Sequence, residues 1–419
     1  MDDGLTIAAA HERGALVTGG PAFLPYGRQC IDDADIQAVA TALKQDYLTT
    51  GPAVGQFEAG FAKAVGARFA VASNSGTAAL HLACMAFDLG PGDSVIVPAV
   101  TFLATANAAR FCGAEVIFAD VDPDSGRLTA ETFQAALDQH PRAAVRAVLP
   151  VHLNGHCADM VAIRALAERR KIVVIEDACH ALGGQHRAGN GSSARVGACA
   201  LSDLACFSLH PVKTMTTGEG GVTTTKDEAI YRRMLQLRSH GMTRNAAAFE
   251  IPDQAFSADG TLNPWYYEMV DLGYNYRITD FACALGLAQL GRLQGFVDRR
   301  RRLAALYDAK LKPLAPIVRP VPGQGGDEPT LHLYAVLIDF QALGIDRATA
   351  MARLKADGIG TMVHYLPVNR QPYYIRRYGP QRLLGADSYY DHALSIPLFP
   401  DMRDADIDRV VDALRRLAD

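Results

Sequence analysis

One lysine, Lys213, lies in a stretch whose residue types could carry covalent chemistry. An apolar run ends at Ser208, and a Gly-Glu-Gly-Gly turn that begins at Gly218 leads into a strand-like Val-Thr-Thr-Thr run, so the pattern places Lys213 on a loop. A lone loop lysine is most often solvated. It becomes a nucleophile when its pKa is lowered or when a carbonyl cofactor captures it as a Schiff base. That chemistry requires partner residues elsewhere in the chain.

Asp177 and His180 follow the strand-like run 172–176 and are candidate partners. A carboxylate at a buried strand end is costly unless a cation lies close to it. A protonated pyridine nitrogen would be such a cation, and each charge would stabilise the other. The alternatives are a helix cap for Asp177 and a hydrogen-bonded core histidine for His180.

Two further strand ends carry groups that suit an anionic, aromatic ligand. Gly76 and Thr77 open a predicted helix, where free amides and the helix dipole favour a phosphate, although Ser75 and Thr77 are also ordinary capping residues. Phe102 could cover a planar ring, whereas a core position is the commoner place for a phenylalanine. His152 and His156 have H-x-x-x-H spacing, but the Asn-Gly between them indicates a turn, so we expect no metal site.

An alternation of strand-like and helix-like segments must position these residues. The expected strands are 68–72, 94–97, 116–119, 144–151 and 172–176, and the helices between them are 78–87, 101–112, 129–138 and 159–170. Two earlier helices are expected at 31–45 and from Phe57 to Val65. Strands this continuously apolar predict an α/β fold with a mainly parallel sheet covered on both faces. Such sheets bind ligands at the carboxyl ends of their strands.

The chain is expected to divide into a flexible extension (1–22), a large domain (23–290) and a smaller α+β domain (291–419). The segments expected in the second half are an irregular loop (242–265), helices (280–290 and 295–310), a Pro/Gly-rich passage (313–329), a strand (331–339), a helix (347–356), a strand (360–364) and a last helix (404–417).

Composition excludes several function classes. With 419 residues, 49% apolar composition and a net charge of -4, the chain can bury a full core and gives no reason to expect nucleic acid. The basic run 299–302 fits a solvated helix face, with a phosphate or lipid patch as the minor alternative. Eight cysteines without a C-x-x-C pair indicate a reducing cytoplasm. No apolar run approaches the roughly 20 residues needed to cross a bilayer.

Three motifs together resemble the DegT-type sugar-nucleotide aminotransferases, pyridoxal 5'-phosphate enzymes of fold type I. They are IEDACHALG (175–183), CFSLHPVKTMTTGEGG (206–221) and LGYNYRITDFACALGLAQL (272–290), and they occur in the order and spacing of the family. The match runs from about residue 25 to the C-terminus. Within the family the chain is most similar to the 4-aminotransferases of pseudaminic acid biosynthesis, on stretches that include LPYGRQ (24–29), NPWYYEM (263–269), HLY (332–334) and VHYLPV (363–368). Members that form amines keep a lysine at position 213, where related sugar 3-dehydratases have histidine.

The resemblance implies a role for each motif residue. Lys213 binds the cofactor as a Schiff base, Asp177 pairs with its pyridine nitrogen and His180 lies near its phenolic oxygen. Phe102 stacks on the ring; the phosphate is held by Gly76, Thr77, Ser208 and, from the neighbouring subunit of a homodimer with shared sites, Asn275. The sugar nucleotide meets Tyr26, Asp46, Tyr47, Leu48, Thr49, His364 and Tyr365.

The implied reaction moves an amino group from L-glutamate to the 4-keto carbon of UDP-2-acetamido-2,6-dideoxy-β-L-arabino-hexos-4-ulose, with Lys213 moving the proton. The nearest alternative is an aminotransferase for another keto-sugar nucleotide. The alternative from a different class is a non-catalytic cofactor-binding or regulatory protein on the same fold, since a fold alone does not determine function.

Overall fold

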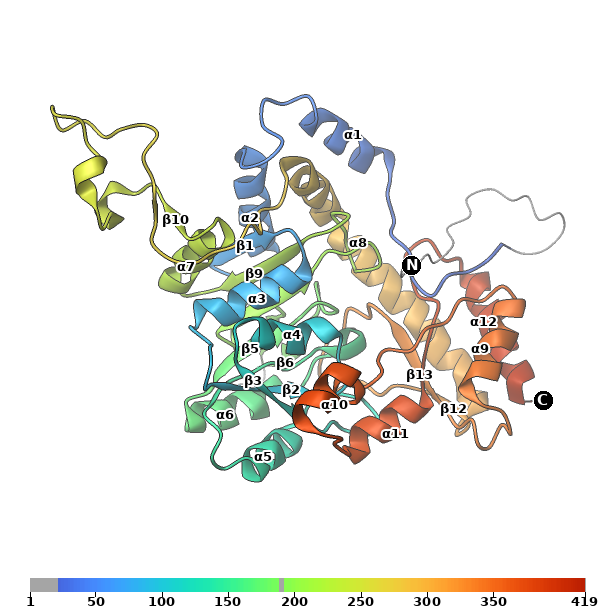
Figure 1. Ribbon diagram of the computed structural model, residues 1–419. Helices are drawn as coiled ribbons and strands as arrows, with labels where there is room; N and C mark the ends of the chain where they lie inside the picture. The colour runs from blue at the N-terminus through green and yellow to red at the C-terminus, as the bar shows by residue number, and fades with distance from the viewer. Residues whose placement is uncertain (1–21, 188–191, 419) are drawn as a thin grey trace, which may run out of the picture.

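Residues 22–187 and 192–418 are described by the computed structural model, and seven strands within them form the central sheet (Figure 1). These strands are β1 (Phe69–Ser73), β2 (Ser94–Pro98), β3 (Glu115–Ala119), β4 (Val145–Val148), β5 (Val173–Asp177), β8 (Leu204–Ser208) and β9 (Gly221–Thr225). Their order is β1-β9-β8-β5-β4-β2-β3. From β3 to β8 all neighbours are parallel, and only β9 runs against both of its neighbours. The predicted mainly parallel sheet is confirmed.

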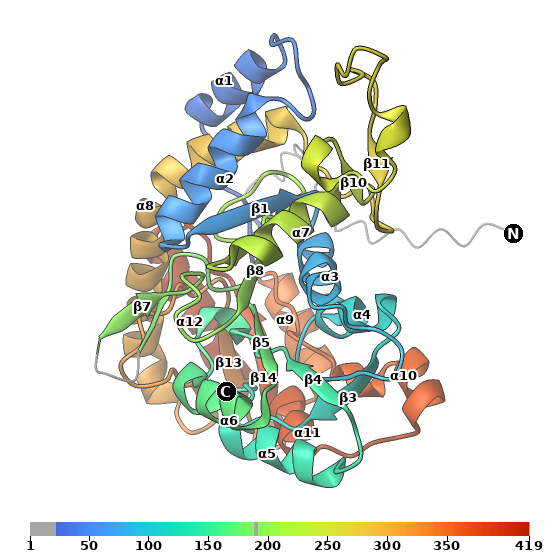
Figure 2. The ribbon, with the colours of Figure 1, turned by 90° about the vertical axis from the view of Figure 1, so that its left-hand side faces the viewer.

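Helices cover both faces of this sheet (Figure 2). One face packs on α3 (Gly76–Ala86), α4 (Leu103–Phe111) and α7 (Glu228–Arg238), and the other on α2 (Pro52–Val65), α5 (Ala130–Gln139) and α6 (Met160–Arg170). Successive side chains of a strand point to opposite faces. In β2, accordingly, Val95 and Val97 join the core under α3 and α4, while Ile96 joins the core under α5 and α6.

The N-terminal part begins with α1 (Asp33–Ala42). Asp32 and Asp35 form a capping box, in which each carboxylate accepts a hydrogen bond from the other residue's backbone N–H (3.0 and 3.1 Å). The helix expected at 31–45 is therefore confirmed in a shorter form. The flexible extension expected at 1–22 lies outside the described residues except for residue 22.

A long helix, α8 (Asp280–Leu311), connects the large sheet to the C-terminal part. The prediction of two helices, 280–290 and 295–310, is wrong, because the helix continues through Gly291 and Gly295, which have open space around them. The expected domain boundary at 290 falls inside α8, and the division into 23–290 and 291–419 stays a prediction. The solvated face predicted for 299–302 is wrong for one residue, since Arg300 is wholly buried.

The C-terminal part contains a small antiparallel sheet of β12 (Val318–Pro320), β13 (Tyr334–Ile338) and β14 (Ala393–Ile396). Its helices are α9 (Arg347–Ala356), α10 (Pro372–Tyr378), α11 (Leu384–His392) and α12 (Asp404–Ala418). The strand predicted at 360–364 is wrong, because that segment makes only an isolated bridge from Met362 to Ser395. The third strand is instead β14.

An arm extends from the large part between α7 and α8 (Figures 1 and 2). It starts at β10 (Met242–Thr243), returns at β11 (Glu268–Met269) and contains the short 3-10 turns η2 (Ala246–Ala248) and η3 (Pro252–Gln254). The prediction of an irregular segment here is confirmed. The remaining short elements are β6 (Gln185–Arg187), β7 (Ser193–Arg195), η1 (Leu153–Gly155), η4 (Lys312–Leu314) and η5 (Val368–Arg370). None of the helices in the described ranges has the length and apolar character of a membrane span.

Candidate active site

Lys213 lies on the loop that joins β8 to β9. The base of this loop is closed by hydrogen bonds from Leu209 N to Gly220 O (2.8 Å) and from Thr217 N to Leu209 O (3.0 Å). Burial of the ammonium lowers the pKa of Lys213, and the neighbouring Cys179 and Asp177 partly offset this effect. The structure therefore holds a desolvated amine beside a carboxylate, which favours the neutral, nucleophilic form of the lysine.

Asp177 ends β5 at the carboxyl edge of the parallel sheet. Its Oδ2 accepts a hydrogen bond from Thr105 Oγ1 (2.7 Å), and its Oδ1 accepts one from Cys179 N (3.1 Å). Thr105 in turn contacts Thr101 Oγ1 (2.7 Å). Asp177 caps no helix and forms no ion pair with a side chain in the described part of the chain. A buried carboxylate that forms no ion pair suits a cationic ring nitrogen.

His180 has a defined tautomer. Its Nδ1 accepts a hydrogen bond from Asn154 N (3.2 Å), so in the neutral ring the proton resides on Nε2. Nε2 lies 3.1 Å from Tyr365 Oη and donates to it. Burial lowers the pKa of His180, and the charge of Lys213 adds to the effect, so the ring is neutral. The Tyr365 hydroxyl thus keeps its own proton available for an acceptor in the site.

Aromatic rings continue from His180 around the site. The ring centroids of Phe102 and Tyr365 lie 5.9 Å apart, those of Tyr365 and His364 4.8 Å apart, and those of His364 and Tyr26 5.4 Å apart. His364 is fixed from behind, since its Nδ1 lies 2.8 Å from Ser395 Oγ. The structure thus brings four residues named from the sequence, Tyr26, Phe102, His364 and Tyr365, into one wall next to His180.

The N-terminus of α3 forms a cradle against β8. A Cβ added to Gly76 would lie 2.7 Å from the Cβ of Ser208, so only glycine permits this approach. The Ser75 side chain caps the N–H of Ala78, and the N–H groups of Gly76 and Thr77 have no partner within the helix. Amides at a helix N-terminus next to a serine hydroxyl are suited to a phosphate.

Two groups of predicted residues are exposed in this chain. The Asn275 carbonyl accepts a hydrogen bond from Asn74 Nδ2 (3.4 Å), and the residue is exposed. The segment Asp46 to Thr49 is also exposed and pairs with the start of α8, where Asp280 N donates to Leu48 O (2.9 Å). Within the described chain, no contact joins this segment to Lys213.

Three buried residues of the site had no role in the sequence analysis. Thr105 binds Asp177, Asn154 binds His180, and the ring of His332 lies 4.5 Å from that of His180. His332 belongs to the HLY motif, which was the available signal. Neither nitrogen of His152 is free for a metal, because Nε2 bonds Glu176 (2.7 Å) and Nδ1 accepts from Ala158 N.

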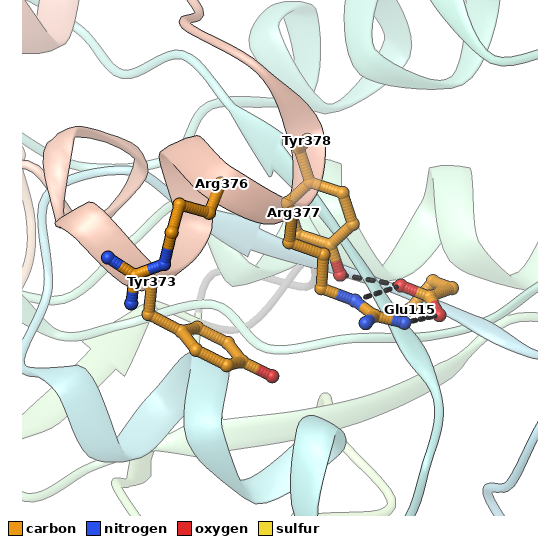
Figure 3. Close-up of a pocket in the computed structure, with 5 residues that line it drawn as sticks. All are labelled: Glu115, Tyr373, Arg376, Arg377 and Tyr378. Atoms are coloured by element: carbon orange, nitrogen blue, oxygen red, sulfur yellow. Dashed lines mark hydrogen bonds and ion pairs between the residues drawn. The ribbon is translucent and has the colours of Figure 1, made fainter.

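A separate surface hollow of about 580 Å³ lies between the start of β3 and α10 (Figure 3). Its lining consists of Glu115, Tyr373, Arg376, Arg377 and Tyr378. Glu115 starts β3, and Asp177 ends the parallel strand β5, so the two lie at opposite edges of the sheet. Glu115 is bound by Arg377 and by the Tyr378 hydroxyl (2.8 Å), so an ion pair forms part of the wall of the hollow. It is therefore not part of the lysine site.

Comparisons with known proteins agree with this geometry. Residues 29–415 match the model of the DegT/DnrJ/EryC1/StrS aminotransferase family. The chain is 37% identical over 396 residues to the spore coat polysaccharide biosynthesis protein SpsC of Bacillus subtilis, covering 94% of this chain and 96% of that protein. The chain belongs to the DegT/DnrJ/EryC1/StrS aminotransferase family.

Solved structures show the same fold. PseC of Helicobacter pylori, an aminotransferase involved in the biosynthesis of pseudoaminic acid, superposes with a TM-score of 0.83 at 24% identity, covering 94% of this chain and 99% of that one. Spr1654 of Streptococcus pneumoniae, solved in a PMP form, has a TM-score of 0.80 at 25% identity and covers 94% and 98%. The fold is that of the pyridoxal phosphate-dependent aminotransferases, and the chain is a sugar aminotransferase that uses this cofactor.

The residues present fit pyridoxal phosphate. The Gly76–Ser208 cradle suits its phosphate, the buried carboxylate of Asp177 suits its ring nitrogen, and the desolvated Lys213 suits its aldehyde. These three groups come from a helix start, a strand end and a loop that all meet at the carboxyl edge of the sheet.

Proposed function

We propose that this enzyme transfers the amino group of L-glutamate to the 4-keto carbon of UDP-2-acetamido-2,6-dideoxy-β-L-arabino-hexos-4-ulose, in pseudaminic acid biosynthesis. The observation that carries the transaminase assignment is the desolvated Lys213 beside Asp177 and His180. The choice of sugar is supported by the motif resemblance and by the role of PseC in the biosynthesis of pseudoaminic acid. SpsC, which is named for spore coat polysaccharide, favours the alternative of another keto-sugar nucleotide.

Each residue of the centre has a proposed role. Bound pyridoxal phosphate supplies an electron sink that acidifies the C–H bond next to the transferred nitrogen. Asp177 keeps the ring nitrogen protonated, Phe102 covers the ring, and the cradle residues Gly76, Thr77 and Ser208 bind the phosphate. The Nζ of Lys213, which is desolvated and has a lowered pKa, would accept the proton of that C–H bond and would deliver it to the carbon on the other side of the transferred nitrogen.

Substrate recognition is assigned to the aromatic wall. Because His180 donates to Tyr365, the Tyr365 hydroxyl donates its proton toward an oxygen of the sugar or the cofactor. Tyr26 and His364 extend this wall toward the nucleotide. The exposed segment Asp46 to Thr49 belongs to the same recognition surface in the proposal, with the partner subunit bringing it to the site.

The proposed enzyme is a homodimer with shared sites. Its arm projects from the body and carries the exposed Trp265, and Leu272, which follows β11, is also exposed, so both offer apolar surface to a second copy. In this arrangement Asn275 reaches the phosphate of the partner's site. The eight cysteines are free, which supports a reducing cytoplasmic location.

The test supplies the purified holoenzyme with L-glutamate and a panel of 4-keto and 3-keto sugar nucleotides, and the configuration of the new amine is determined by NMR. We expect amination of the 4-keto substrate named above. Lys213→Ala should abolish turnover, whereas Lys226→Ala, an exposed lysine after β9, should not change it. Amination of a different member of the panel alone would replace the proposed sugar. Near-normal turnover by Lys213→Ala would contradict the catalytic assignment.

A further inference from the structure

Arg300 is a buried charge directly behind the active site. It lies in the middle of α8 with no exposed surface, and its Nη1 donates to two carbonyl oxygens, those of His332 (3.1 Å) and Leu398 (3.0 Å). Its Nε has no partner. No carboxylate pairs with it in the described part of the chain, and burial lowers the pKa of Arg300 to about 10. A buried cation of this kind is costly unless an anion comes close to it.

The residue that Arg300 holds, His332, is fixed in place by its backbone. Besides the bond from Arg300 to its carbonyl, the next residue, Leu333, donates its N–H to Asn154 O (3.3 Å). The chain also packs so closely on Gly155 that a Cβ there would lie 2.8 Å from His332 N. His332 therefore has a defined position beside His180, whose ring lies 4.5 Å away.

The protonation of His332 follows from its surroundings. Its Nδ1 is buried and has no hydrogen-bond partner. Its Nε2, in contrast, is not one of the buried atoms of the described chain that lack a partner. A proton on Nδ1 would be an unsatisfied buried donor, so the neutral ring carries its proton on Nε2. Burial lowers the pKa of His332, and the charges of Lys213 and Arg300 lower it further, so the ring stays neutral.

We propose that His332 presents its Nε2–H group to the carboxylate of the amino-acid donor, and that Arg300 is the positioning residue behind it whose charge makes the site attractive to an anion. The charge of Arg300 is met only by carbonyl oxygens in the described part of the chain, so the His332 side of the site carries a positive charge that no carboxylate balances. This inference rests on the proposed function, because it identifies the group that recognises the donor.

The test measures binding of glutarate, an unreactive dicarboxylate, to the holoenzyme by calorimetry, with UDP as the second ligand. His332→Gln places an amide N–H near the position of Nε2, and His332→Asn places it near Nδ1. We expect His332→Asn to weaken glutarate binding roughly ten- to hundred-fold, because this is the affinity that one hydrogen bond to a charged group contributes. We expect His332→Gln to keep the affinity within about threefold of the wild type. UDP binding should stay unchanged in both, and the visible cofactor band and the thermal midpoint report whether the fold is retained.

Two results would overturn the inference: equal glutarate affinity in the wild type and in His332→Asn, or equal losses of glutarate and UDP affinity. A wild type that aminates no sugar nucleotide would contradict the proposed function, and this is a separate measurement. Arg300→Gln should weaken glutarate binding several-fold. Arg300→Lys should bind glutarate with the affinity of the wild type, because lysine keeps the charge. A purely structural arginine would change stability in both variants without this difference in glutarate affinity.

Discussion

At the scale of single residues, the positions of protons decide what the site can do. Asp177 accepts one hydrogen bond at each oxygen, from the hydroxyl of Thr105 and from the backbone of Cys179, and both bonds require an ionised or acceptor oxygen. His180 accepts at Nδ1 and donates at Nε2. The site therefore has one buried negative group, a neutral imidazole and a desolvated amine, and each state depends on its neighbours.

The first prediction concerns Asp177→Asn. The amide cannot hold a ring nitrogen protonated, and its NH2 group would face either the Thr105 hydroxyl or the Cys179 N–H. We expect kcat/KM to fall by roughly 10²-fold or more, since each pKa unit of lost stabilisation corresponds to about tenfold. Steady-state assays and cofactor retention on a desalting column measure the effect.

The matched control for this substitution is Asp159→Asn. Asp159 caps α6 by accepting from Ala162 N (3.1 Å), and asparagine is an equally good cap. Its activity should equal that of the parent. If Asp177→Asn behaves in the same way as this control, Asp177 has only a structural role.

Single residues were predictable from sequence where the local pattern carried the signal. Lys213 follows a strand and precedes a glycine turn, and Asp177 follows a buried run, so their places on a loop and at a strand end could be predicted. Thr105 and His332 could not be predicted, because each is separated from its partner by at least 72 residues of chain. Thr105 meets Asp177 only through the packing of α4 near β5, and His332 meets His180 only through the packing of the C-terminal part near β5. No local spacing encodes such contacts.

At the scale of elements, the start of α3 is the place where the fold requires a glycine most strictly. The close approach of Gly76 to Ser208 leaves no room for a side chain, and it directs the free amides of the helix toward the lysine loop. The same glycine had only a weak meaning in the sequence, where any glycine after a strand suggests a turn.

We therefore predict that Gly76→Ala separates cofactor binding from fold stability. The added methyl group must displace Ser208. Affinity for the cofactor should therefore fall by at least about tenfold, because a lost or distorted hydrogen bond to a charged group reduces affinity by this factor. Fluorescence titration of the apoenzyme with pyridoxal phosphate measures the change.

Gly295→Ala is the control within a helix. This glycine lies in the interior of α8 with nothing within 4 Å of an added Cβ. Alanine there should stabilise the protein by about 0.5 to 1 kcal/mol and leave cofactor affinity unchanged. If both variants bind the cofactor as the parent does, the Gly76 cradle does not hold the phosphate.

The errors in the predicted elements have physical reasons. Gly291 and Gly295 suggested a break, but the helix propensity they cost is small compared with the packing of α8 against α2 and its hydrogen bond from Gln289 to Asp35 of α1. Strand β14 has four residues and is followed directly by Pro397, which made it too short to recognise. The segment at 360–364 is apolar enough for a strand but finds only one bridging partner, Ser395.

At the scale of the whole molecule, buried neutral histidines couple stability to pH. The pKa of His364 is lowered to about 3, first by burial and then by Lys213, whereas the unfolded chain has a value near 6.5. Between these values the unfolded state binds more protons than the folded one, so stability decreases as pH falls from about 6.5 toward 3.

We predict that this residue alone removes about 2 kcal/mol of stability on going from pH 7.5 to pH 5, as measured by urea unfolding at each pH. His364→Asn keeps a polar group near Ser395 but does not titrate, and it should flatten the profile by that amount. His140→Asn, an exposed histidine, is the control expected to leave the profile as it is. Parallel profiles for His364→Asn and the parent would contradict the prediction.

The predicted assembly depends on the position of Asn275. Asn275 is exposed, and its carbonyl is held by Asn74, which directly precedes the Ser75 cap of α3. It is thus placed beside the cradle of its own chain, while the arm next to it projects outward (Figure 2). A role in the same chain and a role in the partner's site are both compatible with these contacts, and subunit mixing separates them.

The last prediction is that inactive Lys213→Ala and inactive Asn275→Asp chains restore activity when mixed. Asn275→Asp is expected to be inactive because its carboxylate repels the cofactor phosphate. In a symmetric dimer with shared sites, each heterodimer has one site with both lesions and one with neither. An equal mixture should therefore recover about a quarter of wild-type activity, because half of the dimers are mixed and half of their sites are intact. Lys213→Ala mixed with Asp177→Asn is the matched control: both lesions lie in the same chain's share of the site, so every mixed site carries one of them. Recovery in neither mixture, after subunit exchange has been verified by mass spectrometry, would place Asn275 at the site of its own chain.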